Sequence, residues 1–296
     1  MALTRDEGLV IVTGAEGHIG RAVCRLLASA EAQFLALDLD PDGQQGILAC
    51  DLRLKDDIAR LFQTHAVRTV IHLAGILPSP FQRDPFMGVD VNLTGSFELL
   101  RHAVQSRVKR FVFASSMSVY GSRPTPRPLK EEDAAAPEEP YGACKRAVEL
   151  VGDALSRGGA IEFVALRIAR VIGPGIKKTS SPWRSQIFEQ RADENPIQIP
   201  FAPGAELSLV HVHDVARMLV TLAGASQLRS SVYNTPAETW EVKSLKEAVE
   251  EARSVRIELG MDGVHGGPGC DGSRFAKEFG FQPQGLREAL ARRNDD

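Results

Sequence analysis

The segment Tyr141-Gly-Ala-Cys-Lys145 contains the pair of residues in this chain best suited to move a proton. Tyr141 and Lys145 stand four residues apart in a stretch, 141–157, whose apolar residues recur at helical spacing, so their side chains share one helix face. A free tyrosine has a pKa of about 10, and lowering it to about 7 takes roughly 4 kcal/mol. A nearby ammonium favours the phenolate. The pair therefore indicates a tyrosine base assisted by lysine; the alternative is an exposed helical pair without chemistry.

Two serines close a predicted strand upstream of this helix. Residues 110–115 (RFVFAS) form a short apolar run without strict alternation, as in a strand that is covered on both faces. Ser115 and Ser116 stand at its carboxyl end. Open α/β sheets bind their ligands at the carboxyl ends of their strands. The two hydroxyl groups are therefore candidates for contact with a ligand.

A glycine-rich loop joins the first predicted strand, 8–13, to the first predicted helix, 18–28. Gly14, Gly17 and Gly20 allow a tight turn and let backbone N–H groups approach a pyrophosphate at the helix N-terminus. A simple tight turn is the alternative. Because the loop lies between a strand and a helix, we expect it to bind a dinucleotide.

An acidic residue ends the second predicted strand. Asp38 lies 18 residues past Gly20, where a carboxylate can accept hydrogen bonds from the adenosine ribose. Leu39 and Asp40 follow it, and neither is an arginine or lysine. A 2′-phosphate would meet negative charge there, so the sequence favours NAD over NADP.

Strand-like and helix-like segments alternate over the first 170 residues. This alternation favours an α/β fold, a Rossmann-type doubly wound parallel sheet with helices on both faces. After Gly173, prolines and glycines break the chain into short pieces, which indicates a small, irregular C-terminal substrate-binding domain. We predict strands at 8–13, 33–38, 47–50, 69–73, 110–115, 161–166 and 207–212, helices at 18–28, 55–64, 91–106, 141–157, 214–223 and 235–251, and loops at 77–83, 177–184 and 260–272.

These patterns predict two functional regions. We expect residues 1–171 to form an NAD-binding domain, to which 205–235 returns. We expect 172–204 and 236–296 to form the substrate-binding region.

Composition excludes several classes of protein. With 296 residues, 43% hydrophobic and 25% charged, the chain is in the ordinary globular range, and its formal net charge of −3 argues against a nucleic-acid partner. No apolar run approaches the roughly 20 residues that cross a bilayer, and the N-terminus has no apolar signal region. Four scattered cysteines and the alternating pair His211 and His213 give no ligand set, so we expect no metal site. We expect a cytoplasmic protein with reduced thiols and without membrane contact.

Together these motifs resemble the extended short-chain dehydrogenases/reductases, specifically the NAD-dependent epimerase/dehydratase family typified by UDP-galactose 4-epimerase. Ser116 lies 25 residues before Tyr141 and four before the Tyr120-Gly121 pair, as the proton-transfer serine of that family does. The resemblance spans the chain through the following segments: TGAEGHIG (13–20), Asp51-Leu52, HLAG (72–75), VNLTGSFELL (91–100), SSMSVYG (115–121), YGACK (141–145), RIARVIGPG (167–175), VHVHDVA (210–216) and DGSRFAKEFGFQP (271–283).

The resemblance implies a role for each matched residue. Tyr141 would take a proton from a substrate hydroxyl, Lys145 would hold the nicotinamide ribose and lower the tyrosine pKa, and Ser116 would hydrogen-bond the reacting oxygen. Asn92 is expected to brace its helix and the neighbouring loop. A homodimer paired through 91–106 and 141–157 is implied, with burial against the sheet as the alternative. The implied cofactor contacts are Gly14, Gly17, His18, Ile19, Gly20, Asp38, Asp51, Leu52, Leu73, Ala74, Gly75, Tyr141 and Lys145.

Three departures from the family pattern narrow the substrate. Met117 and Ser118 replace the acid pair of dehydratases, so dehydration is disfavoured. Arg170 replaces the usual diphosphate-contacting Asn, and Leu207-Ser208 replaces a usual Arg-Asp. Ser116, Met117 and Arg170 are the candidate substrate contacts, since Arg170 could bind a phosphate or carboxylate, or could be purely structural.

These departures leave the reaction open between two types. We predict NAD-dependent oxidoreduction at a secondary alcohol of a sugar-like substrate, by a sugar epimerase or by a sugar or sugar-acid dehydrogenase. The alternatives are an NAD(P)-dependent reductase of a small hydroxy or keto compound, or a non-catalytic dinucleotide sensor on the same fold. The intact Ser116, Tyr141 and Lys145 argue against the sensor.

Overall fold

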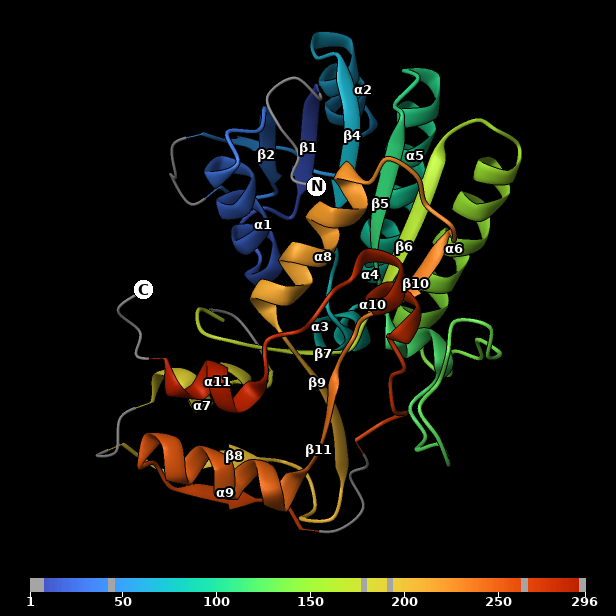
Figure 1. The fold of residues 1–296 in the computed structure, drawn as a ribbon. Coiled ribbons are helices and arrows are strands. Elements are labelled where there is room, and N and C mark those ends of the chain that lie inside the picture. The colour runs from blue at the N-terminus through green and yellow to red at the C-terminus, as the bar shows by residue number, and fades with distance from the viewer. Residues whose placement is uncertain (1–7, 42–45, 177–179, 191–193, 262–265, 293–296) are drawn as a thin grey trace.

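The computed structural model describes residues 8–41, 46–176, 180–190, 194–261 and 266–292. Its largest unit is an all-parallel sheet of seven strands in the order β10-β6-β5-β4-β1-β2-β3 (Figure 1). The strand order reverses beside β1, which is where doubly wound sheets bind ligands. The strands are β1 (Leu9–Thr13), β2 (Phe34–Asp38), β3 (Ile47–Ala49), β4 (Val67–His72), β5 (Arg110–Ser116), β6 (Glu162–Ile168) and β10 (Val232–Asn234).

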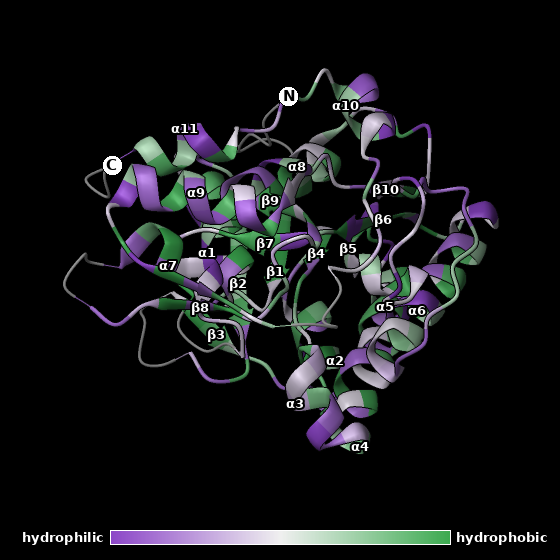
Figure 2. Cartoon of the chain, turned by 90° about the horizontal axis from the view of Figure 1, so that it is seen from below, coloured by the Kyte–Doolittle hydropathy of each residue, from purple (hydrophilic) through white to green (hydrophobic). Residues whose placement is uncertain are grey.

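Helices cover both faces of this sheet, so the predicted α/β doubly wound fold is confirmed. Successive strand residues point to opposite faces: Val10 and Val12 pack with α1 (His18–Ser29) and α8 (Val212–Gly224), whereas Ile11 packs on the other side. That other side is covered by α2 (Lys55–Thr64), α5 (Ser96–Gln105) and α6 (Pro140–Arg157). Figure 2 shows hydrophobic strands at the centre and hydrophilic residues on the outer faces of helices such as α6 and α9.

The second half of the chain adds two small sheets around a separate apolar core that includes Trp183 and Leu245. One has the order β11-β9-β7 and the other pairs β12 with β8. Its elements are β7 (Arg170–Ile172), α7 (Trp183–Glu189), β8 (Ile197–Ile199), β9 (Glu206–His211), β11 (Glu238–Glu241), α9 (Val242–Arg253), β12 (Ile257–Leu259) and α11 (Leu286–Ala291). Connecting pieces are α3 (Pro78–Arg83), α4 (Pro85–Val89), the π-helical segment η2 (Asp90–Gly95), the 3₁₀-turn η3 (Met117–Tyr120) and α10 (Ser273–Phe279).

Residues 205–235 divide between the two parts of the molecule. β9 pairs with β7 and β11 in the small sheet, while β10 pairs with β6 in the large one. Between them, α8 packs against α1 and the large sheet. Within the described part of the chain, no helix has both the length and the apolar character that crossing a membrane requires.

Several predicted elements are wrong in detail. Residues 238–241 form the strand β11, not the start of a helix, because they pair antiparallel with β9. The predicted loop 77–83 contains α3, and the predicted loop 177–184 ends in α7; its residues 177–179 lie outside the described chain. Of the predicted loop 260–272, the described residues form neither helix nor strand apart from a bridge between Leu129 and Cys270.

Candidate active site

A pocket of about 590 Å³ opens at the carboxyl ends of β1, β2 and β4. These ends of the strands face the second half of the chain (Figure 1). The volume of the pocket is in the range of small-molecule and cofactor sites. Residues 171, 176 and 184 of the second half also line it, so both halves form its walls. The predicted cofactor contacts among its lining residues are Gly14, Gly17, His18, Ile19, Gly20, Asp38, Asp51, Leu52, Leu73, Ala74 and Gly75.

The glycine loop packs too closely for side chains at two of its positions. Gly14 has φ +71°, and a Cβ there would lie 2.7 Å from the Ala74 backbone nitrogen. A Cβ on Gly20 would overlap the Gly14 carbonyl oxygen and lie 2.8 Å from the Ala15 Cα. The N-terminus of α1 therefore rests directly on the loop and faces the pocket. This is a cradle that fits a pyrophosphate, because unpaired N–H groups and the positive end of the helix dipole lie together.

Asp38, at the end of β2, presents a fixed carboxylate to the pocket. Its Oδ2 accepts the Glu16 backbone N–H at 2.9 Å, and its Oδ1 accepts that of Leu39 at 2.8 Å. Each oxygen retains a lone pair, so the carboxylate can still accept hydroxyl hydrogens. The neighbouring wall holds Asp51, whose pKa is lowered by hydrogen bonds from Arg53, and the buried Leu52.

A buried hydrogen-bond chain supports the loop that follows β4. The Ser96 hydroxyl donates to the Asn92 carbonyl at 2.8 Å, so His72 Nε2 must donate to Ser96 Oγ at 2.9 Å. His72 Nδ1 then accepts from the Thr13 hydroxyl at 2.7 Å, and Thr13 Oγ1 accepts the Ala74 backbone N–H. Burial lowers the His72 pKa to about 3, which keeps the ring neutral. Sequence reasoning missed this chain, although Thr13 and His72 end neighbouring strands.

Asn92 braces the same loop, as expected. Its side-chain oxygen accepts the Ile76 N–H at 2.7 Å, and its side-chain nitrogen donates to the Ile76 carbonyl at 2.8 Å. Asn92 belongs to the π-helical segment η2, and short π-helical segments are frequent at functional sites. The segment Leu73–Gly75 is therefore held from both sides, by Thr13 and by Asn92.

The structure brings Ser116, Tyr141 and Lys145 together beside the pocket. Ser116 lies close enough to Tyr141 to lower the pKa of its phenol, and the Ser116 hydroxyl donates to Ser118 Oγ at 3.1 Å. The buried Lys145 ammonium donates to the Ala114 carbonyl at 2.8 Å and lies 5.8 Å from the centre of the Tyr141 ring. These three side chains adjoin the pocket and do not line it: Ala114 is in its wall, and a side chain on Gly75 would reach within 3.7 Å of Lys145 Nζ.

Burial is the largest influence on the pKa values of Tyr141 and Lys145. It raises the pKa of Tyr141 to about 12, an effect that the nearby Ser116 opposes to a smaller extent. It lowers the pKa of Lys145 to about 8, against the opposing effects of Cys144 and Glu149. In the protein alone, the phenol is therefore neutral at pH 7 and the ammonium is charged.

Residues of α1 tie the second half of the chain to the glycine loop. His18 Nε2 bonds the Pro174 carbonyl at 2.9 Å, and Arg21 donates to the carbonyl oxygens of Glu16 and Gly175. Burial lowers the His18 pKa to about 4, so Nε2 carries the proton of a neutral ring. Arg21 lines the pocket, as do Ile176 and Arg184. Arg184 ends the segment 177–184, which the sequence suggests as a pocket loop, whereas Arg21 and Ile176 were not predicted because only the folded chain places them there.

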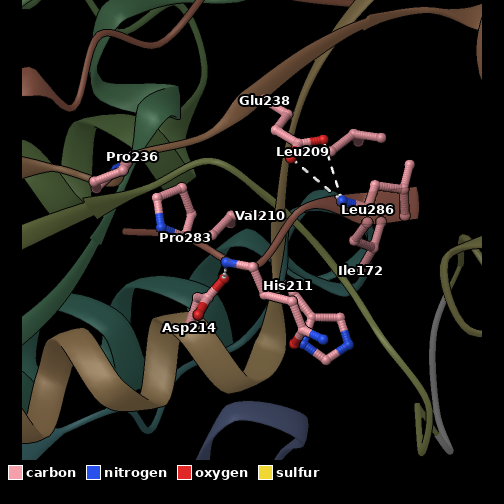
Figure 3. A pocket seen from close by; sticks show the side chains of 10 residues that line it. Ile172, Leu209, Val210, His211, Asp214, Pro236, Glu238, Pro283 and Leu286 are labelled. Atoms are coloured by element: carbon pink, nitrogen blue, oxygen red, sulfur yellow. Dashed lines mark hydrogen bonds between the residues drawn. The ribbon is translucent and has the colours of Figure 1, made fainter. Parts of the chain in front are cut away.

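The pocket in Figure 3 is too small for a substrate, because its volume of about 10 Å³ holds at most one water. It marks the line where the C-terminal segment packs on the rest of the chain. There the Gln284 N–H donates to Asp214 and the Leu286 N–H donates to Glu238, which fixes the C-terminal segment on α8 and β11. His211 ends β9 whereas His213 lies in α8, so strand alternation does not place them on one face. Among the described residues, no cluster of three or more histidine, cysteine or acidic side chains could hold a metal.

Comparison with known proteins decides the family. The model of the NAD dependent epimerase/dehydratase family matches residues 10–235. The chain belongs to this family. It is an enzyme family whose members depend on NAD, in agreement with the glycine loop and Asp38 described above.

The relatives include proteins named for two different activities, epimerase and dehydrogenase. UDP-glucose 4-epimerase of Halalkalibacterium halodurans is 30% identical over 171 residues, covering 55% of this chain and 51% of that protein. D-erythronate dehydrogenase of Haemophilus influenzae is 25% identical over 194 residues, covering 61% of this chain and 61% of that protein. The solved structure of MoeE5 in complex with UDP-glucose and NAD is 28% identical, with a TM-score of 0.81 over 96% of both chains. The matched stretch thus spans about half the length of the curated epimerase.

Two candidate substrate residues of this epimerase/dehydratase family member lie away from the pocket lining. Met117 is 9% exposed and packs in the apolar core between the sheet and α8. Arg170 stacks its guanidinium 4.8 Å from the centre of the Phe201 ring and donates to the Gly266 carbonyl at 3.2 Å. Burial lowers its pKa to about 10. A substrate role for either residue stays a prediction.

Proposed function

We propose that this protein catalyses NAD-dependent hydride transfer at a secondary alcohol of a sugar or sugar acid. One observation carries the proposal: Ser116, Tyr141 and the buried Lys145 ammonium come together beside a pocket built by a glycine loop, with Lys145 Nζ 5.8 Å from the Tyr141 ring centre and Ser116 lowering the Tyr141 pKa. A dinucleotide sensor would have no use for a buried lysine and tyrosine held in this way, because burying the ammonium has a free-energy cost.

The residues of the chain would divide the proton transfer among them. Tyr141 takes the proton of the substrate hydroxyl, and Ser116 hydrogen-bonds the reacting oxygen. When bound, NAD supplies the hydride acceptor. Because burial raises the Tyr141 pKa to about 12, the phenolate needs positive charge beside it, from the Lys145 ammonium and from the cofactor. Gly14, Gly17 and Gly20 would hold the pyrophosphate, Asp38 the adenosine ribose, and Leu52 the adenine.

We further propose that the two halves divide the work and that the protein forms a homodimer. Residues 1–171 would bind NAD together with α8 and β10 of the segment 205–235, and 172–204 with 236–296 would select the substrate, with β9 of the segment 205–235 paired to that second part. Support for a dimer comes from Leu150 and Val151, which leave 52% and 41% of their surface exposed on α6. Light scattering on the purified protein tests it, since the mass of a single chain would contradict the dimer.

The reaction type follows from a single assay. Purified protein is incubated with NAD and a panel of free sugars, sugar acids and nucleotide sugars, while NADH absorbance and product are followed. Net NADH identifies a dehydrogenase, and product without NADH identifies an epimerase. Leu207 is buried and the Ser208 hydroxyl accepts the Cys270 N–H, so neither offers the positive charge that a nucleotide diphosphate requires. We therefore expect turnover first among sugars and sugar acids.

Replacing the proposed base tests the mechanism. Tyr141→Phe removes only the hydroxyl that carries the proton, so we expect turnover to fall by at least about 100-fold, the lower range for a general base, while NAD affinity stays within about threefold. Fluorescence titration with NAD provides the control. Unchanged turnover in this variant would sink the mechanism.

A further inference from the structure

Glu149 joins the helix of Tyr141 and Lys145 to the strand of Ser116. It lies on α6 one turn after Lys145 and is 3% exposed. Its Oε1 accepts the Ser115 hydroxyl at 2.6 Å and Arg167 Nε at 2.9 Å. Its Oε2 accepts Arg167 Nη2 at 2.8 Å and Arg146 Nη1 at 2.9 Å. One carboxylate therefore receives four hydrogen bonds from three elements.

The strands beneath place these partners next to the catalytic serine. Ser115 of β5 is paired in register with Arg167 of β6, and Ser116 is the next residue along β5. Arg167 extends the network to the Tyr120 hydroxyl at 2.5 Å, on the turn that follows Ser116. Any movement of α6 relative to β5 would therefore break bonds to Glu149.

Glu149 supplies the buried negative charge beside two buried cations, Lys145 and Arg167. Lys145 and Arg167 are 4% and 2% exposed, so the interior holds two cations close to one helix turn. A buried charge without a partner is strongly disfavoured. The titratable groups acting on Lys145 are His72 of β4, which is neutral, and Cys144 and Glu149 of α6.

We propose that Glu149 is a positioning residue for the Tyr141–Lys145 pair, which holds α6 on the strand of Ser116 and keeps the Lys145 side chain protonated inside the protein. Arg167 limits this effect, because it shares the same carboxylate. The proposal rests on the proposed function for its catalytic meaning. The protonation of Lys145 can, however, be measured without any substrate.

The test compares variants of the full chain that change charge and shape separately. Glu149→Gln keeps the shape and loses the charge, so we expect the Lys145 titration to move down by about 1–3 pH units. Glu149→Asp keeps the charge and should restore most of that shift. Arg167→Met removes the competing cation, so the titration should move up. A general loosening of the structure would move the Lys145 titration in the same direction in both variants. A downward shift in Glu149→Gln and an upward shift in Arg167→Met therefore point to the charges themselves.

Nuclear magnetic resonance of isotope-labelled lysine reads the titration, with the Lys145 signal assigned by its loss in Lys145→Met. In parallel, the alkaline limb of the kcat profile should move in the same directions, while NAD affinity is kept. An unshifted titration in folded Glu149→Gln, or an equal shift in Glu149→Asp, overturns the proposal. If Glu149→Gln does not fold, the sign of the Arg167→Met shift decides. If the wild-type protein has no turnover, the proposed function fails while the lysine titration still tests Glu149.

Discussion

At the scale of a single residue, the burial that the proposed catalytic role of Lys145 requires lowers the stability of the protein. The Lys145 ammonium is nearly without solvent, and its one hydrogen bond to the protein among the described residues goes to the Ala114 carbonyl. The sign of its contribution follows from its pKa, about 8 in the folded protein against about 10.4 for a free lysine. At pH 7 both states are protonated and the folded state bears the full burial cost. Between pH 8 and 10.4 the folded state loses its proton first, and the cost declines.

Lys145→Met should therefore stabilise the protein while abolishing turnover. We expect the free energy of unfolding at pH 7 to rise by about 1–3 kcal/mol, because an apolar chain replaces a buried charge. The gain should shrink toward zero as the pH approaches about 10.5. Urea unfolding at a series of pH values measures it, with Lys130→Met, on the surface loop after η3, as the control. A variant that is less stable than wild type at pH 7 would contradict the assigned burial cost.

At the scale of the element, α1, β1 and β4 meet at the glycine loop. Gly20 lies in the first turn of α1, and a Cβ there would overlap the Gly14 carbonyl and approach the Ala15 Cα to 2.8 Å. Backbone atoms are in the way, so the contact cannot be relieved by turning a side chain. The helix itself would have to move away from the loop that faces the pocket.

Gly20→Ala should consequently damage both stability and NAD binding. We expect a loss of about 2 kcal/mol or more in the free energy of unfolding, typical of backbone overpacking, and a loss of at least about tenfold in NAD affinity. Gly204→Ala is the matched control: nothing lies within 4 Å of its Cβ, so its stability should change by less than about 0.5 kcal/mol. Thermal unfolding and NAD titration compare the two. Wild-type NAD affinity in Gly20→Ala would show that α1 does not need this close approach.

Most elements were predictable because their signals are local. The helix predicted at 55–64 matches α2 to the residue, and six of the seven strands of the large sheet appear where short apolar runs stand. The seventh, β10, was not predicted, and the strand predicted at 207–212 lies in the small sheet. Residues 238–241 escaped prediction because their strand depends on pairing with β9, more than 25 residues earlier in the chain. The same holds for residues of the site. Tyr141 and Lys145 share one helix, so their spacing alone predicts that they lie together, whereas the Glu149 partners Ser115 and Arg167 come from β5 and β6.

At the scale of the whole molecule, one buried histidine, His72, and two half-buried histidines, His18 and His211, join parts of the fold and share one response to acid. His18 links α1 to Pro174, His72 ends β4 in the large sheet and bonds Thr13 of β1, and His211 packs edge-on against Phe188 in the second half. Burial lowers their pKa values to about 4, about 3 and about 4, respectively. A histidine in an unfolded chain titrates near pH 6.5.

Acid should therefore destabilise the protein well above the range in which carboxylates titrate. As the pH falls below 6.5, the unfolded chain binds protons that the folded chain does not, so the free energy of unfolding decreases. Each such proton contributes at most about 1.4 kcal/mol per pH unit, and because the unfolded histidines are only half protonated at pH 6.5, three of them lower the free energy of unfolding by up to about 5 kcal/mol between pH 6.5 and 5. His72→Gln removes one of these protons and should reduce the slope by about one third. Ser96→Ala removes a hydrogen bond to His72 but keeps the ring, and should lower stability at every pH without changing the slope. Urea unfolding of wild type and the two variants at pH 7, 6.5, 6, 5.5 and 5 measures the free energy of unfolding and its slope against pH. An equal slope in wild type and His72→Gln would show that His72 is not buried in its neutral form.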